Sequence, residues 1–240
     1  MPDFSTEKER KRLEEVAKWF GNDQGINCEI AGHIAALIIK HAQGNRALEL
    51  GCASGGMTRA LLKRFSHLDV VEAASSYAAQ ARAIVQQKGQ VYECLFEEFT
   101  CRESYDTIAA TGILEHVENP SALLSRVRAW LNPEGCIYIA VPNAESLHRR
   151  VGHQMGLLNS LDQLNDSDIA IGHRRVYTWD TLTADITAAG LQVVSLEGVL
   201  IKPLPSAAME ALSPDLRAAF FGLASIAPRL CSEIFAICRI

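Results

Sequence analysis

The chain has 240 residues, enough for one large domain or two small ones at roughly 150 residues per domain. It carries 23 Lys and Arg against 28 Asp and Glu, so its formal net charge is −5 at pH 7 with neutral histidines. At 48% hydrophobic and 21% charged residues, the composition is typical of an ordered globular protein and excludes a disordered chain.

Membrane and secretory features are absent from the sequence. The longest stretches without Asp, Glu, Lys or Arg run only ten or eleven residues, whereas a membrane-spanning helix needs roughly 18 to 20 apolar residues. The first twelve residues lack the apolar segment of a signal peptide. Seven scattered cysteines form no Cys-x-x-Cys pair, which is typical of free thiols in a reducing compartment. These features predict a cytoplasmic protein that does not bind membranes.

Two helices are predicted before the first strand, over Thr6–Phe20 and from about Asn27 to Ala42. Short apolar runs then alternate with helical patterns. The predicted strands are Ala47–Leu50, Leu68–Val71, Gln90–Leu95, Tyr105–Ala110, Cys136–Val141, Leu191–Leu200 and Ser232–Cys238. The predicted helices between them are Gly55–Phe65, Tyr77–Gln87 and Ser121–Trp130, with a helical excursion over Ser206–Ile226. This alternation indicates an α/β fold with a doubly wound, mostly parallel seven-stranded sheet.

One long segment, Asn143–Gly172, interrupts the alternation and exceeds an ordinary connection, which predicts an inserted helical lid over the active face. After it, Thr178 is predicted as a helix N-cap with Asp180 in the first turn, and Gly190 as the residue just past that helix. We therefore expect a single domain made of N-terminal helices (1–44), a cofactor-binding core (45–143), the insertion (144–172) and the C-terminal part of the sheet (173–240).

The turn after the first strand reads Ala47-Leu-Glu-Leu-Gly-Cys-Ala-Ser-Gly-Gly. Gly51 permits a positive φ, and Gly55 and Gly56 let a ligand approach the backbone. The spacing G-x-x-x-G-G differs from the G-x-G-x-x-G of dinucleotide-binding proteins. Glu72 ends the next strand, 21 positions after Gly51 (72 − 51), and a carboxylate at that spacing suits the two hydroxyls of a ribose. Together these features predict a ribose-bearing cofactor beyond the carboxyl ends of the strands.

These motifs resemble those of the class I S-adenosylmethionine-dependent methyltransferases, in particular bacterial small-molecule enzymes such as the ubiquinone-pathway O-methyltransferases. Leu48–Gly55 is similar to their first motif, Val71-Glu72 to their ribose-holding acid, and Tyr105–Pro120 and Leu131–Asn143 to their fourth and fifth strands. The resemblance covers roughly Asn45–Asn143 and implies the Rossmann-like methyltransferase fold. One departure is Ala53, where the family often has glycine, and we expect the loop to tolerate it.

The resemblance implies S-adenosyl-L-methionine as the cofactor. The residues implied for its methionine part are Glu49, Gly51, Cys52, Ala53, Ser54 and Gly55, with Thr111 and Gly112 lining the pocket beside it. Glu72 with Ala73 is implied for the ribose, and Phe96 with Glu97 for the adenine. Glu98 is the alternative to Glu97 as the adenine-binding acid. A solvated turn in which neither glutamate binds a ligand is the other interpretation.

Glu115-His116 follows the fourth strand. Some relatives, among ubiquinone-pathway and RNA-end methyltransferases, carry Glu-x-x-Glu-His here and bind a divalent metal. In this chain Gly112 replaces the first glutamate, and one carboxylate with one imidazole makes a poor magnesium site. His173 is a possible third ligand that sequence alone does not place, so we expect no metal. His116 is the candidate catalytic residue, as a general base or as the group that orients the acceptor, and a structural histidine is the alternative.

Two triplets, His148-Arg-Arg and His173-Arg-Arg, flank the insertion. Arginine pairs bidentately with carboxylate or phosphate, so the triplets favour an anionic acceptor, with solvated arginines as the alternative. The candidate acceptor-binding residues are His148, His173, Arg174, Tyr177 and Trp19, the last of which can instead be a core residue. The net charge of −5 and the lack of a basic stripe argue against nucleic acid, while a protein substrate stays open.

The sequence therefore predicts a methyltransferase acting on an oxygen or nitrogen atom of a small polar, possibly anionic, molecule. Methyl transfer asks mainly for alignment of the reacting atoms and exclusion of water. The alternatives are a nucleotide-linked oxidoreductase and a non-catalytic binding protein on the same fold. The glycine spacing counts against the first, and the intact Gly51, Gly55 and Glu72 count against the second.

Overall fold

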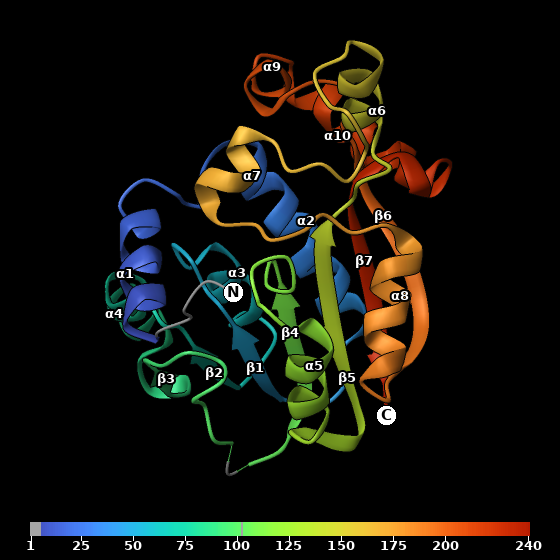
Figure 1. Cartoon of the computed structure of the whole chain (residues 1–240). Coiled ribbons are helices and arrows are strands. Elements are labelled where there is room, and N and C mark those ends of the chain that lie inside the picture. The colour runs from blue at the N-terminus through green and yellow to red at the C-terminus, as the bar shows by residue number, and fades with distance from the viewer. Residues whose placement is uncertain (1–5, 102) are drawn as a thin grey trace. The chain divides into compact units, whose positions relative to one another are not determined.

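The computed structural model describes residues 6–101 and 103–240. Residues 1–5, the first part of the segment that lacks the apolar run of a signal peptide, lie outside the described residues. Within the described ranges, none of the helices combines the length and the apolar character needed to span a membrane. The strands form one seven-stranded sheet in the order β3-β2-β1-β4-β5-β7-β6 (Figure 1).

The sheet is mostly parallel, as the alternation of strands and helices predicts. β1 pairs in parallel with β2 and β4, and β2 pairs in parallel with β3, whereas β7 runs antiparallel to β5 and β6. The strands are β1 (Arg46–Leu50), β2 (His67–Val71), β3 (Val91–Tyr92), β4 (Tyr105–Thr111), β5 (Leu131–Pro142), β6 (Gln192–Ile201) and β7 (Cys231–Arg239). The chain thus has the doubly wound architecture with antiparallel strands at one end of the sheet.

The described residues group into two compact units. The first unit holds the chain up to Ala110 together with Trp130–Gly135, and the second holds Thr111–Ala129 together with Cys136–Ile240. The expectation that the whole chain is a single domain stays a prediction.

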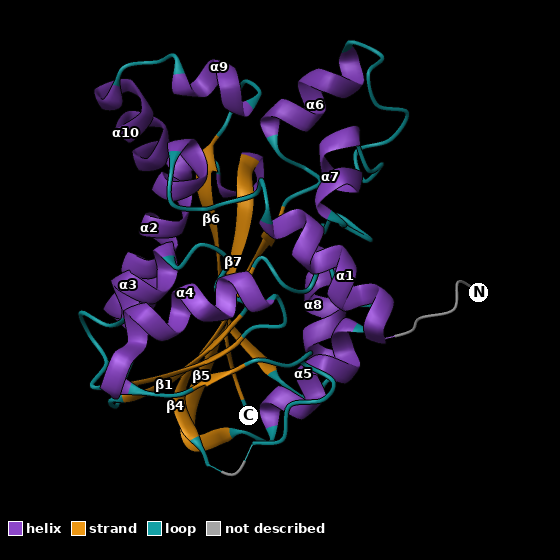
Figure 2. Cartoon of the chain, turned by 90° about the vertical axis from the view of Figure 1, so that its left-hand side faces the viewer, coloured by secondary structure: helices purple, strands orange, loops and turns teal. Residues whose placement is uncertain are grey.

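In the first unit, helices surround two buried strands. All of β1 after Arg46 and all of β2 after His67 is buried, which explains the nearly continuous apolar character of these runs. α2 packs against α3, and α4 packs against both α3 and α1 (Figure 2). These helices are α1 (Thr6–Ala17), α2 (Gly25–His41), α3 (Gly56–Leu61) and α4 (Ser75–Val85).

The third strand is much shorter than the predicted Gln90–Leu95. β3 ends at Tyr92, and the chain then makes a turn in which the Glu98 carboxylate accepts a hydrogen bond from the Leu95 N–H at 3.0 Å. The Phe99 N–H donates to the Leu95 carbonyl at 3.1 Å. Since these local bonds satisfy the backbone at Leu95, the chain leaves the sheet early.

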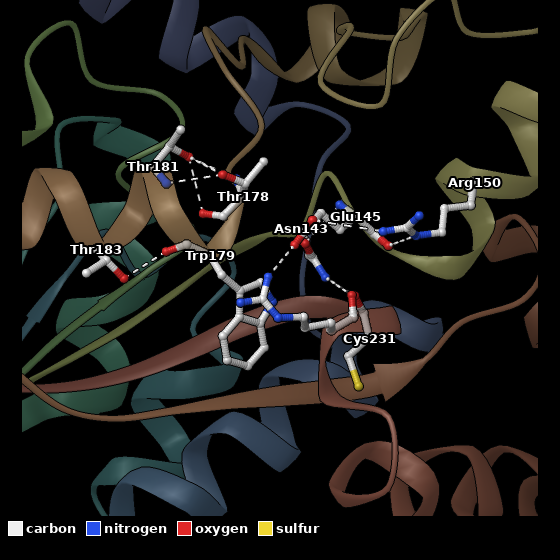
Figure 3. Close-up of polar contacts among 9 residues, drawn as sticks. Asn143, Glu145, Arg150, Thr178, Trp179, Thr181, Thr183 and Cys231 are labelled. Carbon is white, nitrogen blue, oxygen red and sulfur yellow. Dashed lines mark hydrogen bonds and ion pairs between the residues drawn. The ribbon is translucent and has the colours of Figure 1, made fainter.

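The second unit contains α5 (Pro120–Arg128), α6 (Leu147–Gln154), α7 (Asp166–Ile171), α8 (Trp179–Ala188), α9 (Ser206–Glu210) and α10 (Pro214–Gly222). α8 begins and ends as predicted: the Thr178 hydroxyl accepts from the Thr181 N–H at 3.1 Å, and Gly190 has φ +75° (Figure 3). The predicted helical excursion is divided, because Ser213 caps a new helix that starts at Pro214.

The predicted insertion carries α6 and α7, and its two ends meet. The Ala144 N–H donates to the Tyr177 carbonyl at 2.7 Å, and the Tyr177 N–H donates to the Pro142 carbonyl at 3.1 Å. The Asn143 side-chain amide donates to the carbonyls of Arg229 and Cys231 at 2.9 and 2.8 Å (Figure 3). The chain therefore leaves and returns at the end of β5, and residues 144–176 form a closed excursion.

Candidate active site

Backbone conformation shapes the turn after β1 in the first unit. Gly51 has φ +66° and Gly55 has φ +82°, both in the left-handed region that favours glycine. A Cβ atom at Gly55 would lie 2.3 Å from Cδ1 of Ile84, so that side chain would also have to shift. Ala53 also adopts a left-handed conformation, with φ +43°. The loop thus keeps its shape with alanine, at a cost of about 1–2 kcal/mol.

Glu72 lies buried behind this turn. Its Oε2 accepts from the Cys52 N–H at 3.1 Å, and its Oε1 accepts from the Ala74 N–H at 2.8 Å. Burial raises the pKa of Glu72, although these N–H donors oppose the effect, and Ala73 beside it is buried as well. The predicted ribose-binding carboxylate therefore also ties the end of β1 to the end of β2 in the free protein.

Glu49, on β1, is a buried carboxyl group. Its side chain is 1% exposed, neither carboxyl oxygen makes a well-formed hydrogen bond among the described residues, and the nearby Thr58 hydroxyl offsets only part of the effect of burial. Burial raises the pKa of Glu49 to about 8. A buried polar group without a partner is costly, so this position favours a ligand that brings a donor or a positive charge.

The segment between α1 and α2 lies against the glycine turn. The Ser54 hydroxyl lies within 3.0 Å of the side-chain oxygens of Asn22 and Asp23, and the Tyr77 hydroxyl donates to the Phe20 carbonyl at 2.5 Å. Trp19, at the end of α1, is 59% exposed. The alternative that Trp19 is a core residue is therefore wrong.

The turn after β3 carries the residues implied for adenine. Phe96 is half-buried and Glu97 is exposed, whereas the Glu98 carboxylate is committed to the Leu95 N–H and to an ion pair with Arg10. This commitment supports Glu97 over Glu98 as the acid available to a ligand.

The second unit brings together Glu115, His116 and His173. One polar side-chain atom from each residue lies within 4.8 Å of the other two. The two imidazole rings are 4.7 Å apart between centroids, at an interplanar angle of 73°. Glu115 is 2% exposed, its Oε2 has no partner among the described residues, and burial raises its pKa to about 8. The sequence alone could not place His173 beside Glu115 and His116.

Thr111 and Gly112 lead from β4 toward this cluster. Gly112 has φ +69°, its N–H donates to the Ala140 carbonyl at 2.9 Å, and a Cβ there would lie 3.7 Å from Oε1 of Glu115. No second carboxylate stands at this position. The cluster therefore lacks the set of oxygen atoms that magnesium prefers, and two imidazoles with one carboxylate are closer to the donors of a zinc site.

The arginines of the first triplet bind protein groups. Arg149 is 4% exposed and donates to the Leu161 carbonyl at 2.8 Å and to Asp168 at 3.1 Å. Arg150 donates to the Glu145 carbonyl at 2.8 Å and faces the Glu145 carboxylate (Figure 3). This triplet holds the insertion together.

The second triplet is used in a similar way. Arg174 donates from Nε to the His116 carbonyl at 2.8 Å, and Arg175 donates to the carbonyls of Leu114 and Val117 at 2.9 and 2.6 Å. The triplets thus fasten the insertion and the loop after β4. Arg150 and Arg174 are exposed, as the alternative of solvated arginines predicts, whereas Arg149 is buried. Because all four arginines donate to groups of the protein, the triplets do not by themselves indicate an anionic acceptor.

The other two acceptor candidates differ from each other. The Tyr177 hydroxyl is buried and donates to Asp185 at 2.9 Å, so it is already paired within the protein. His148 has a buried Nδ1 without a partner among the described residues. Burial, together with the charges of Lys202 and Arg149, lowers the pKa of His148 to about 3 and keeps the ring neutral.

Lys202 and Glu233 were not predicted as site residues from the sequence. Lys202 lies directly after β6, and Glu233 lies near the start of β7. Burial lowers the pKa of Lys202 and raises that of Glu233, and each charge opposes the shift of the other. Lys202 also donates to the Ser206 hydroxyl at 2.8 Å. A charged residue in or directly after a predicted apolar strand was the signal that could have found them.

Comparison with known proteins agrees with these features. A family model described as a methyltransferase domain matches residues 23–196. The chain belongs to this family and is a class I S-adenosylmethionine-dependent methyltransferase. The oxidoreductase and non-catalytic alternatives are therefore set aside.

Among curated relatives, the chain is 24% identical to a ubiquinone biosynthesis O-methyltransferase of Aeromonas salmonicida, over 67% of this chain and 68% of that protein. It is 22% identical to a malonyl-[acyl-carrier protein] O-methyltransferase of Halalkalibacterium halodurans, over 50% and 51%. Among solved structures, the N-methyltransferase NodS of Bradyrhizobium japonicum in complex with S-adenosyl-L-homocysteine has a TM-score of 0.61 at 15% identity, covering 99% of this chain and 98% of that one.

Proposed function

We propose that this S-adenosylmethionine-dependent methyltransferase acts on an oxygen or nitrogen atom of a small polar molecule. The observation that carries the proposal is the cluster of Glu115, His116 and His173 in the second unit, which gathers proton-accepting groups. Such groups serve an acceptor that keeps its proton at neutral pH. The names of the relatives are consistent with either atom, since they include both O- and N-methyltransferases.

The residues of the first unit suit the cofactor. Glu49 would give the ammonium of its methionine part a charged partner, and Glu72 would hold the ribose beside the left-handed turn at Gly51–Gly55. Phe96 and Glu97 would hold the adenine, and the place of Thr111 and Gly112 beside the methionine part stays a prediction from the resemblance. The bound cofactor supplies an activated methyl group on its sulfonium. The chain's own work is to align the acceptor and exclude water.

For the acceptor we propose recognition by His148 and His173, without a requirement for negative charge, while a role for the exposed Trp19 of the first unit stays a prediction. Each arginine of the two triplets donates to a group of the protein. Arg174 and Tyr177 then act by holding the loop after β4 and α8 in place. A cytoplasmic location is part of the proposal, supported by seven cysteines, all within the described ranges, that form no disulfide.

We further propose that methyl transfer needs no metal. Gly112 leaves the cluster without the second carboxylate of a magnesium site, and the test separates the proposal from a zinc ion held by the three remaining donors. Activity is expected to persist in excess EDTA after the protein has been dialysed. Loss of activity with EDTA, followed by recovery with zinc or magnesium, would show that Glu115, His116 and His173 bind a metal instead.

The function is tested by incubating the enzyme with methyl-labelled cofactor and separated small-molecule, protein and RNA fractions of a bacterial extract. Label is expected in the small-molecule fraction, and the position of the new methyl group follows from mass spectrometry. The matched control is Glu72→Ala, which should transfer no label. Transfer confined to protein or RNA would contradict the proposed acceptor class.

A further inference from the structure

Asp168 and His173 form a buried pair at the end of the insertion. Nδ1 of His173 lies 3.2 Å from Oδ1 of Asp168, and the two side chains are 7% and 12% exposed. Helix α7 ends at Gly172, whose φ of +86° turns the chain so that the His173 N–H donates to the Asp168 carbonyl at 2.8 Å. The turn therefore places the imidazole beside a carboxylate of the preceding helix.

The Asp168 carboxylate is held in its ionised form. Its Oδ2 accepts from Arg149 at 3.1 Å and from the Asn165 N–H at 3.0 Å, while Oδ1 faces His173. Burial alone would raise the pKa of Asp168, but the hydrogen bonds from His173, Asn165 and Arg149 outweigh it and lower the pKa to about 2. An ionised carboxylate only accepts hydrogen bonds, so Nδ1 of His173 carries the ring proton and Nε2 carries the lone pair.

The Nδ1 atoms of the two imidazoles face different acceptors. Nδ1 of His116 lies 3.3 Å from the Gly172 carbonyl, a neutral group, whereas Nδ1 of His173 faces the Asp168 carboxylate. A carboxylate beside an imidazole fixes the tautomer and stabilises the imidazolium that forms when the ring takes a proton. Of the two imidazoles in the cluster, His173 is therefore the better placed to accept a proton.

We propose that His173 is the general base of the acceptor site, and that Asp168, held by Arg149, is the residue that positions it. The proposal rests on the proposed function. As the acceptor oxygen or nitrogen bonds to the methyl carbon and the carbon–sulfur bond breaks with its electron pair left on sulfur, the acceptor proton passes to Nε2 of His173. The proton leaves later to water, and the ring returns to its Nδ1-protonated form.

The proposal makes the insertion part of the catalytic machinery. The carboxylate that positions the base also closes the capping box of α7 with Asn165, and its arginine comes from α6. Glu115 and His116, from the loop after β4, are ionisable groups close to His173. Lys202 and Glu233, at the ends of β6 and β7, interact electrostatically with Asp168. A disordered insertion would therefore leave the imidazole without its orienting partner.

The test compares two matched substitutions in the full chain, His173→Asn and His116→Asn. Asparagine keeps a donor near the place of Nδ1 and removes Nε2, so each variant retains its bond to Asp168 or to the Gly172 carbonyl. With a methylated acceptor identified as above, His173→Asn should lower kcat by roughly 10²–10⁴-fold with little change in KM. His116→Asn should lower kcat far less. The reverse order would overturn the proposal and assign the base to His116.

Asp168 is tested by Asp168→Asn against Asp166→Asn, an exposed acid on the same helix. Asp168→Asn should lower kcat strongly at unchanged S-adenosylhomocysteine affinity, and Asp166→Asn should match the wild type. A second measurement needs no variant and no acceptor: ¹⁵N NMR of the wild-type enzyme should show the His173 ring protonated at Nδ1. An Nε2-protonated ring, or recovery of Asp168→Asn by added zinc, would overturn the proposal even if methyl transfer to a small molecule is established.

Discussion

The two units build their parts of the methyltransferase in different ways. In the first unit, the cofactor turn is made of backbone: left-handed glycines at Gly51 and Gly55 and one carboxylate, Glu72, that binds two N–H groups. In the second unit, the cluster is made of side chains, and His173 is held by a buried ion pair. The first kind of site depends on a backbone conformation that side chains at Gly51 and Gly55 would strain. The second depends on buried charges, so a single loss exposes an uncompensated partner.

The largest effect is expected for Arg149→Met, which removes one member of the buried pair in the second unit. Breaking such a pair typically costs about 3–5 kcal/mol, because the remaining charge stays buried. Urea unfolding should show this loss, while S-adenosylhomocysteine binding should be little changed. The neighbouring Arg150→Met removes a half-exposed pair with Glu145 and should cost less than about 1 kcal/mol. Equal losses in the two variants would contradict the comparison.

Glu72→Ala should affect both stability and ligand binding in the first unit. It leaves the N–H groups of Cys52 and Ala74 without their carboxylate, at about 1–3 kcal/mol. It should also abolish the rise in Tm that S-adenosylhomocysteine causes in the wild type. Thermal melts with and without the ligand check both effects, with the exposed Glu134→Ala as control. A full ligand response in Glu72→Ala would show that the ribose lies elsewhere.

Glu49 and Glu115 allow the same pH test in each unit. Burial raises the pKa of both from 4.5 to about 8, so the native state holds these protons more tightly than the unfolded chain. Their contribution to stability is therefore complete below about pH 4.5 and is lost as the pH rises through about 8, by up to about 1.4 kcal/mol per pH unit for each group.

Glu49→Gln should flatten the pH dependence of the free energy of unfolding, and Glu115→Gln should do so independently. Glu97→Gln, an exposed carboxylate in the first unit, serves as the control and should leave the curve unchanged. S-adenosylhomocysteine should weaken the pH dependence that Glu49 causes, since a ligand ammonium would favour the ionised carboxylate. A curve for Glu49→Gln that superposes on the wild type contradicts this assignment.

The smallest effect is expected for Ala53→Gly. The left-handed φ of +43° strains alanine by about 1–2 kcal/mol, and the extra freedom of an unfolded glycine offsets about 0.5–1 kcal/mol of that gain. The variant should therefore be more stable by up to about 1 kcal/mol in urea unfolding. Ala60→Gly, in helix α3, should instead be destabilised by about 1 kcal/mol.

The same contrast explains how much the sequence could predict. The glycine turn and the capped start of α8 are formed by residues close together in the sequence, so Gly51 and Thr178 predict them directly. The early end of β3 rests on one carboxylate, Glu98, which the strand pattern does not show. Glu115 and His116 lie far along the chain from His173, and the arginines donate to backbone carbonyls, so neither arrangement leaves a local pattern.

The closed excursion at residues 144–176 has a consequence for engineering. Because the carbonyl and N–H of Tyr177 bond to the Ala144 N–H and the Pro142 carbonyl, the end of β5 and the start of α8 fix the ends of the excursion whatever its length. Doubling the length of a flexible loop between fixed ends costs only about 0.6 kcal/mol. Residues 155–160, which lie between α6 and the carbonyl of Leu161 that holds Arg149, can therefore be exchanged or lengthened to vary the acceptor preference while Asp168 and His173 stay in place.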